Sequence, residues 1–480
     1  MQRAGVEGQT NEKQNIKQMK KSLQGSFLII TLFAAIASMV ACKNNTGSFA
    51  LPTVDVSPVV TGLTSTTITV YGRSTSANII TENGICFSST NKVPTISDIK
   101  KADTLGARWD INFTALVPGQ TYYFRAYATN ETGTGYSDVL TITMPANDAA
   151  PVGTVTTFAG STTGANGYAD GTGTATLFDG PQNISYNAQN SLLYVSDTYN
   201  NAIRTITTGG TSATLNVSAV GYVNGALNQA SFYGPRGMSF DATGNAYVAD
   251  LGNNVIRKIS TGGIVSTLAG NTIAGYVNGD AAKAEFLNPT ATAVDGSGNV
   301  YVADRTNNLI RKITSAGVVS RFAGYEAPTG YSQVSVPGYI DGDAASAYFN
   351  YPVALATDAA GNIYVADNKN KAIRKITPTG TVSTYAGGLN YPKIIGSPTG
   401  IALDAQGNMF IVDSNGRILE ITNQKVLYVI AGANATGFQN GVGAAARFAN
   451  PQSIAVDPQG NLYVADYNNN VIRKITVKVQ

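Results

Sequence analysis

An aspartate closes nearly the same short run of residues six times in this chain, and a ring of such carboxylates could bind a divalent cation or transfer protons. Each aspartate, however, ends a β-rich run and opens an Asn-rich turn, where its side chain can accept backbone N–H hydrogen bonds. We therefore interpret these carboxylates as structural. The six are Asp197, Asp250, Asp304, Asp367, Asp413 and Asp466.

An arginine also recurs once per copy in most of these runs. We expect it to pair locally or to cover apolar surface with its stem rather than to form a binding site. The arginines are Arg204, Arg257, Arg311, Arg374 and Arg473.

The spacing of the aspartates, 53, 54, 63, 46 and 53 residues, indicates a supersecondary unit stacked on copies of itself. The third copy, residues 289–324, contains four short β-rich runs separated by Gly, Asn and Asp turns. No sustained helical periodicity interrupts them, so there is no room for crossover helices. Four antiparallel strands repeated six times are typical of the blades of a β-propeller.

The two ends of the repeat region complement each other. The last copy stops at residues 475–480 without the run that follows the other copies, and a run of that type, residues 155–160, precedes the first copy. We expect this N-terminal run to become a strand of the last blade. Such closure leaves no long sheet edge open to aggregation.

The repeated residues resemble the NHL repeat family. The pattern Gly-Asn-x-Tyr-Val-Ala-Asp is intact from Gly244, Gly298, Gly361 and Gly460, and nearly so from Gly407. The resemblance covers residues 152–480 and implies an all-β fold with a six-bladed propeller. Some propellers of this type are amidating lyases that hold zinc with His, an activity not expected here because the chain has no His.

Residues 1–41 have the pattern of an N-terminal extension followed by a secretory signal. Lys20 and Lys21 precede an apolar run, residues 27–41, which is shorter than the ~20 residues that a membrane-spanning helix needs. Residues 39–42 resemble a bacterial lipobox, which implies lipidation of Cys42 and anchoring in the cell envelope, at the outer membrane or the cell surface. A plain signal peptide and an uncleaved anchor are the alternatives. Met19 fits the start of a signal peptide better than Met1 does, so whether residues 1–18 are translated stays open.

Residues 50–145 form a separate unit. Alternating runs at residues 66–71 and 122–128 indicate a β-sandwich. Residues 116–122 resemble the Leu-x-Pro-Gly-Thr-x-Tyr corner of fibronectin type III domains, which implies that the Tyr122 hydroxyl bonds back to the upstream backbone. Such domains commonly act as spacers, and residues 146–151 would link this one to the propeller.

Composition excludes several classes of function. The absence of His excludes His-based catalytic triads, His general bases and the common zinc sites. Residues 43–480 carry 27 basic and 27 acidic residues, so this neutral chain has no electrostatic footprint for nucleic acid. Cys86 lies in an apolar run and is interpreted as a small buried hydrophobe. It has no partner for a disulfide if Cys42 is lipidated.

A second recurring element, Gly-Tyr-x-Asp/Asn-Gly in most copies, precedes several of the repeated runs. Asp170, Asp341 and Asp343 in this element hint at calcium, but their spacing matches no complete loop motif, and Asp-Gly and Asn-Gly are ordinary turn residues. We expect no cofactor and no metal ligand, while calcium binding through oxygen ligands stays open.

Ligand binding is expected where the repeats differ from one another. In a four-stranded meander, the connection into the inner strand and the connection between strands two and three emerge at the same end, and variable loops carry function. Tyrosine beside Arg or Lys suits sugars and peptides. The candidates are Tyr199, Tyr233, Arg236, Arg305, Tyr325, Tyr331, Tyr351, Lys369, Tyr391 and Tyr467.

The sequence thus predicts a non-catalytic lipoprotein whose propeller binds an extracytoplasmic glycan or protein, but no nucleic acid. Two alternatives stay open. A metal-dependent hydrolase or lyase with Asp and Asn ligands predicts a tightly bound divalent ion near the propeller axis. A structural adhesin predicts a protein partner and no pocket for a small ligand.

Overall fold

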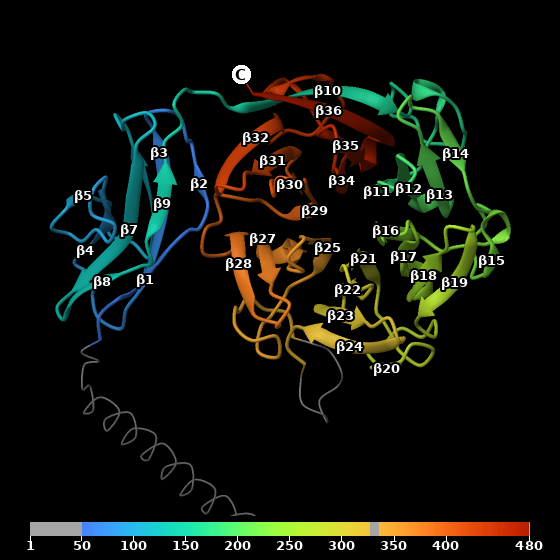
Figure 1. Cartoon of the computed structure of the whole chain (residues 1–480), viewed down its shortest axis with the longest axis horizontal. Helices are drawn as coiled ribbons and strands as arrows, with labels where there is room; N and C mark the ends of the chain where they lie inside the picture. The colour runs from blue at the N-terminus through green and yellow to red at the C-terminus, as the bar shows by residue number, and fades with distance from the viewer. Residues whose placement is uncertain (1–49, 327–335, 480) are drawn as a thin grey trace, which may run out of the picture.

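The computed structural model describes residues 50–326 and 336–479. Figure 1 shows a ring of small sheets beside a separate sandwich of strands. The helices among the described residues are 3-10 turns of three residues, and none of them is long and apolar enough to cross a membrane. The expected signal peptide (1–41), Cys42 and Tyr331 lie outside the described residues. The 3-10 turns are Gly173–Ala175, Thr198–Asn200, Leu227–Gln229, Leu251–Asn253, Asn368–Asn370, Gly443–Ala445 and Tyr467–Asn469.

Residues 50–145 form two groups of strands around one apolar core. Buried and exposed residues alternate along β3 and β6, as they must where one face of a sheet meets water. The Val117 N–H donates to the Tyr122 hydroxyl at 3.1 Å, which confirms the hydrogen bond expected at this corner. The first group is β1 (Thr53–Val56), β2 (Val60–Thr61), β3 (Ile68–Thr75) and β6 (Arg108–Phe113). The second is β4 (Glu82–Ser88), β5 (Ile99–Ala102), β7 (Thr121–Asn130), β8 (Gly133–Tyr136) and β9 (Leu140–Thr143).

Residues 151–479 fold into a ring of four-stranded antiparallel meanders, which confirms the predicted all-β propeller (Figure 1). Each meander runs outward from an inner strand near the axis. The first three are β11 (Pro181–Asn187), β12 (Leu192–Asp197), β13 (Ala202–Ile206), β14 (Ser212–Thr214); β16 (Pro235–Phe240), β17 (Ala246–Asp250), β18 (Val255–Ile259), β19 (Ile264–Ala269); and β21 (Pro289–Val294), β22 (Val300–Asp304), β23 (Leu309–Ile313), β24 (Val318–Ala323). The next two are β25 (Pro352–Thr357), β26 (Ile363–Asp367), β27 (Ala372–Ile376), β28 (Val382–Gly387); and β29 (Pro398–Leu403), β30 (Met409–Asp413), β31 (Arg417–Ile421), β32 (Val426–Gly432).

The last meander closes the ring with a strand from the start of the propeller. Its strands are β34 (Ser453–Val456), β35 (Asn461–Asp466), β36 (Val471–Val479) and β10 (Pro151–Ala159), and β10 pairs antiparallel with β36. The predicted closure is therefore confirmed. Two-residue strands flank the outer edges of three sheets: β15 (Gly225–Ala226), β20 (Gly279–Asp280) and β33 (Gly441–Val442).

Neighbouring meanders pack face to face, which explains why their second strands are mostly apolar up to the closing aspartate. All five residues of β22 are buried, although side chains alternate between the two faces of a sheet. Ala303 of β22 and Val365 of β26 share one apolar cluster with Phe349. Full burial of one such large side chain contributes about 1.5–3 kcal/mol, and every sheet of the ring gains this on both faces.

The sandwich docks on the meander β29–β32. Val60 of β2 pairs in parallel with Val426 of β32, and Val426 belongs to the apolar core of the sandwich. Lys393 donates to Asp110 across the junction at 2.6 Å. Tyr391 is buried at this junction, with only 8% of its surface exposed.

Closure by β10 can be tested with one backbone hydrogen bond. Thr154 pairs with Thr476 of β36 on one side and with Val442 of β33 on the other, so its N–H faces a partner strand in either direction. Thr154→Pro should lower the free energy of unfolding by about 1–3 kcal/mol or more, because a proline has no N–H to donate. Thr154→Ala retains the N–H and serves as the control. Equal unfolding midpoints of the two variants in urea would contradict the role of β10.

Candidate functional site

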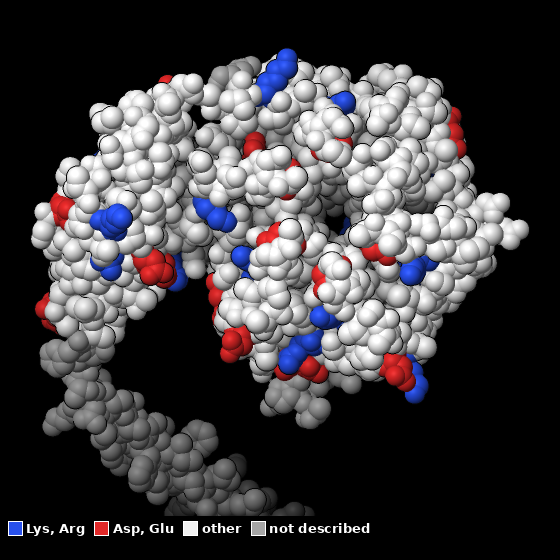
Figure 2. Space-filling view, viewed as in Figure 1, with Lys and Arg blue, Asp and Glu red and all other residues white. Residues whose placement is uncertain are grey.

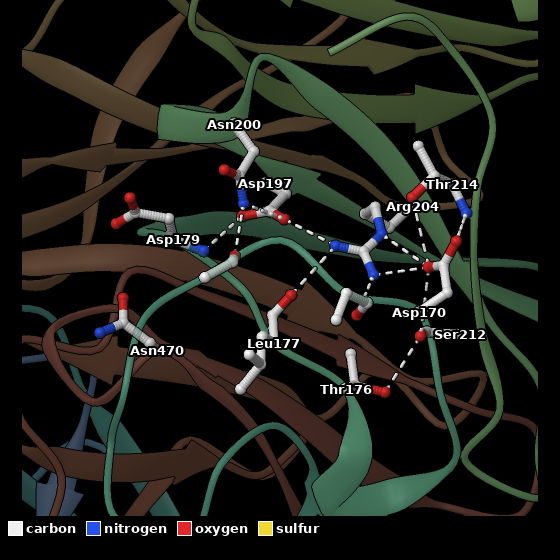
Figure 3. A network of polar contacts seen from close by, with 12 residues as sticks. Asp170, Thr176, Leu177, Asp179, Asp197, Asn200, Arg204, Ser212, Thr214 and Asn470 are labelled. Atoms are coloured by element: carbon white, nitrogen blue, oxygen red, sulfur yellow. Dashed lines mark hydrogen bonds and ion pairs between the residues drawn. The ribbon is translucent and has the colours of Figure 1, made fainter.

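The repeated aspartates form hydrogen bonds and ion pairs within the propeller, as Figure 3 shows for the meander β11–β14. The buried Asp197 carboxylate accepts from Arg204 Nη1 and from Asn200 Nδ2, both at 2.9 Å. Its other oxygen accepts the Asp179 backbone N–H at 2.7 Å. Asp197 therefore ties the third strand to the loop that enters the inner strand.

Four other meanders repeat this ion pair. The Asp–Arg distances are 2.8–2.9 Å, and both side chains are fully buried in every pair. The pairs are Asp250–Arg257, Asp304–Arg311, Asp367–Arg374 and Asp466–Arg473. The interpretation of these residues as structural, with local pairing and backbone N–H donors, is confirmed.

In the meander β29–β32 the aspartate pairs with an arginine at a different position. Leu419 occupies the strand position of the arginine, opposite Ile411. Asp413 pairs instead with Arg417, which opens the same strand two residues earlier. The aspartate thus keeps a guanidinium partner although the repeat pattern is broken.

The Gly-Tyr-x-Asp/Asn-Gly element supplies the second partner of each buried arginine. Arg204 Nη2 lies 2.5 Å from Asp170, and Arg374 Nη2 lies 2.6 Å from Asp341. Asn224, Asn278 and Asn440 take the equivalent place. The Asp170 and Asp341 carboxylates thus bind guanidiniums, and the structure gives no support there for the calcium site that they suggest.

Two aromatic rings flank each of these guanidiniums at 4.7–5.4 Å. Burial raises the pKa of Asp197 and of Asp367 to about 6, against the opposing effect of their Asn and Arg partners. Both remain ionised at neutral pH. No group of three or more acidic or Cys residues suited to a metal is present within residues 50–326 and 336–479.

Cys86 is buried, and its thiol donates to the Arg125 carbonyl oxygen at 3.3 Å. Burial raises the pKa of this thiol to about 11, so it stays protonated at neutral pH. Because the thiolate is the reactive form, Cys86 is a packing residue, as predicted.

A different set of residues surrounds an open cavity of about 470 Å³ that runs along the propeller axis. Its wall contains residues from the inner strands of all the meanders, and no Asp or Glu. Figure 2 shows the opening at the centre of the ring. The residues before the inner strands, such as Tyr351 and Asn450, line it together with residues that follow second strands, such as Arg305 and Asn368. The two kinds of connection therefore meet at one end, as predicted.

A β-bulge near the start of the inner strands β11, β16, β21, β25 and β29 aims one side chain of each into this cavity. The register between the first two strands shifts directly after the proline, for example between Pro289 and Ala291. The extra residue leaves the ladder, which is how bulges redirect side chains. The residues after the prolines line the cavity: Gln182, Arg236, Thr290, Val353, Thr399 and Gln452. Only Arg236 among them is charged.

Arg236, Arg305 and Tyr351 line the mouth of the cavity, and Lys369, Tyr199 and Tyr467 lie beside them. Two cations lie over the Tyr351 ring, Arg305 at 4.7 Å and Lys369 at 4.4 Å from its centroid. The hydroxyls of Tyr199 and Tyr467 are hydrogen-bonded to each other. Arg236 Nε donates to the Gln182 side-chain oxygen.

Close packing at the mouth depends on Gly180. Its φ of +60° favours glycine, and a Cβ there would lie 2.6 Å from the Tyr199 ring and 3.0 Å from the Tyr467 ring. The tyrosine pair therefore sits directly on the backbone of the loop before β11.

Tyr351 occupies a backbone conformation that a tyrosine rarely adopts. Its φ is +65°, and the equivalent positions before other inner strands hold Gly180, Gly234, Asn288 and Asn450 with φ of +51° to +60°. Glycine and asparagine tolerate this region, whereas a bulky residue there is strained by about 1–3 kcal/mol. The scaffold enforces it, because the Tyr351 N–H donates to Asn308 Oδ1 of the preceding meander at 2.8 Å.

The electrostatics of the mouth are positive. Burial and the charge of Arg305 lower the pKa of Arg236 to about 10, and burial also lowers the pKa of Arg305. A pKa near 10 leaves Arg236 protonated at neutral pH. Among the described residues, neither arginine nor Lys369 forms a salt bridge.

The structure brings six of the ten sequence candidates together at the mouth and places Tyr233 nearby, with its N–H on Asp250 and 49% of its surface exposed. Tyr325 stacks on Tyr348 and neither residue lines the cavity, and Tyr391 is buried at the junction with the sandwich. Gln182, Asn368, Asn450 and Gln452 line the cavity but were not among the candidates. Gln182 and Gln452 each directly follow a repeated proline, and this recurring position could have identified them from the sequence.

The sequence model of the NHL repeat matches three segments of this chain, residues 286–313, 349–376 and 448–475. The chain therefore carries NHL repeats within its propeller. SUPPRESSOR OF QUENCHING 1, chloroplastic, of Arabidopsis thaliana is 27% identical over 321 residues, which cover 65% of this chain and 26% of that protein. Teneurin-3 of Mus musculus is 27% identical over 265 residues, 52% of this chain and 8% of that protein. The chain thus spans about a quarter or less of these relatives.

Two solved structures from Bacteroides thetaiotaomicron share the fold. A structural genomics protein of unknown function has a TM-score of 0.51 at 18% identity, with 89% of this chain and 98% of that chain covered. An auxiliary nutrient binding protein has a TM-score of 0.50 at 14% identity, with 88% and 99% covered. The coverage exceeds the propeller alone, so the likeness of fold extends into the sandwich.

The structural role of the buried ion pair gives a test. Arg311→Met should lower the free energy of unfolding by about 3–5 kcal/mol, because Asp304 is left buried without its charge partner. Lys283→Met, which removes the exposed pair with Asp280, is the control and should change little. Chemical denaturation measures both. An Arg311→Met loss no larger than that of the control would contradict the role of the pair.

Proposed function

We propose that this protein is a non-catalytic, envelope-anchored lipoprotein whose six-bladed NHL-type propeller binds an extracytoplasmic glycan or protein at the mouth of its axial cavity. The fibronectin type III-like sandwich would serve as the spacer. The observation that carries the proposal is Tyr351: a strained tyrosine with two cations over its ring, at a position where four other repeats hold Gly or Asn. Strain of this kind concentrates at functional sites.

A binding role fits the chemistry of the cavity better than catalysis does. Among the described residues, the cavity wall contains Ser, Thr, Asn, Gln and Arg side chains and no carboxylate that could act as a general base or complete a metal site, and the chain has no His. The repeated carboxylates already bind guanidiniums. A hydrolase or lyase with Asp ligands would therefore need other residues.

The fold neighbour described as an auxiliary nutrient binding protein supports the choice of a binding function. The cavity also favours a ligand-binding protein over a purely structural adhesin, for which no pocket is expected. At about 470 Å³ it falls within the size range of small-molecule sites.

The ligand hypothesis is tested by replacing the strained residue with the one that other repeats use. Tyr351→Asn should weaken ligand binding by about tenfold or more, since the ring that orders Arg305 and Lys369 is lost. The same variant should be as stable as the parent or more stable by about 1 kcal/mol, because the strain is relieved. Retention on immobilised polysaccharides and extracellular proteins, together with thermal unfolding, measures both effects.

Tyr123→Asn, on the sandwich, is the matched control and should bind as the parent does. Equal retention of parent and Tyr351→Asn, or no ligand retained by the parent, would overturn the proposed site.

The lipid anchor is tested separately. Cys42→Ser should move the protein from the membrane fraction to the soluble fraction, because the thioether-linked lipid can no longer form. Mass spectrometry of the mature N-terminus should find a lipid on Cys42 in the parent. A parent protein that is soluble, or a variant that stays in the membrane fraction, would contradict lipidation at this residue.

A further inference from the structure

We propose that the mouth recognises an oxyanion, the carboxylate or sulfate group of an acidic saccharide, through Arg236 and Arg305. This inference rests on the proposed binding function and adds the chemical class of the ligand. It follows from the charge, the unused hydrogen-bond donors and the aromatic surface of the mouth.

Within residues 50–326 and 336–479, the cations at the mouth have no acidic partner. Arg305 lies close enough to Arg236 for its charge to lower the pKa of Arg236, and Lys369 adds a third cation next to Tyr351. The cavity wall carries no Asp or Glu. Asp179, in the loop before β11, belongs to none of the ion pairs among the described residues. The contrast with the scaffold is direct, because Arg204, Arg257, Arg311, Arg374 and Arg473 each have a buried carboxylate.

The hydrogen-bonding capacity of the two guanidiniums is largely unused. Arg236 uses Nε for Gln182, while its two terminal nitrogens have no acceptor among the described residues. Arg305 Nε is buried without any acceptor there. A guanidinium presents paired N–H groups that match the two oxygens of a carboxylate or sulfate, so these donors fit an oxyanion in a bidentate manner.

The aromatic residues indicate that the acid belongs to a saccharide. Tyr199 is 60% exposed beside Tyr467, and Tyr233 is 49% exposed nearby. Tyr351 is fixed in place by the cations on it. Tyrosine rings offer apolar faces for sugar rings together with hydroxyls for hydrogen bonds, which a bare inorganic anion would not need.

Isothermal titration calorimetry of the full chain with defined probes tests the proposal. The probes are a tetramer of galacturonate, a sulfated tetrasaccharide, a neutral cellotetraose, inorganic sulfate and a tetraglutamate peptide. The galacturonate or the sulfated tetramer should bind, and the neutral tetramer should bind much more weakly. Added salt should weaken binding, because it screens the charges.

Arg236→Gln and Arg305→Gln should each weaken binding by about tenfold or more, since each removes one charged donor pair. Arg305→Lys should recover part of the loss, because it restores the charge without the paired geometry. Arg108→Gln, an exposed arginine of β6, is the matched control and should bind as the parent does. Thermal unfolding of every variant verifies that it is folded.

The pattern of probes separates the outcomes. Binding of the galacturonate tetramer alone assigns a carboxylate, and binding of the sulfated tetramer alone assigns a sulfate. Binding of the neutral tetramer, unaffected by Arg236→Gln, would overturn the acidic class while leaving the proposed binding function intact. Binding of the peptide alone, of inorganic sulfate alone, or of no probe would overturn the saccharide assignment.

Discussion

The buried Asp–Arg ion pair is the interaction on which the propeller depends. Its carboxylate joins the third strand through the arginine, the turn through an asparagine and the loop into the inner strand through a backbone N–H. A buried ion pair stabilises a fold little compared with an apolar replacement, because both ions lose their hydration. Its value here is geometric, since it fixes the loop that carries the mouth residues. The aromatic rings on both sides of the guanidinium exclude water from the pair.

In each repeat, the residues that recur hold the propeller together, and the residues that vary form the mouth of the cavity. Residues that recur satisfy one another: Asn308 of one meander holds the Tyr351 N–H of the next, as Asn470 holds that of Gly180. Residues that do not recur face the cavity. At the position after the proline, Arg236 stands alone among neutral residues, and Arg305 follows its aspartate where Asn368 and Ser414 follow theirs. The proposed binding site therefore consists of the residues that differ between repeats, held on repeated residues that do not.

The propeller, its closing strand and the Tyr122 hydrogen bond could be predicted from the sequence, because each depends on local strand and turn residues. The sequence located most of the mouth through residues that vary between repeats. It predicted local pairing of the arginines but not that their partner is the repeated aspartate, which depends on the register between two strands, nor that Arg417 takes the place of an arginine two positions later. Tyr391 is buried by the docking of the sandwich, a contact between segments distant in sequence. Gln182 and Gln452 face the cavity because bulges or local backbone turns redirect them, which residue type alone does not encode.

Hydrogen–deuterium exchange with and without a bound saccharide tests most directly whether the mouth is the binding surface. The account predicts slower exchange in the loops before β11, β16 and β25 and in the turns after β22 and β26, since a ligand there restricts their opening. The Asp241 and Asp295 turns, between first and second strands, should exchange at the same rate in both states. Protection confined to those turns or to the sandwich would contradict the account.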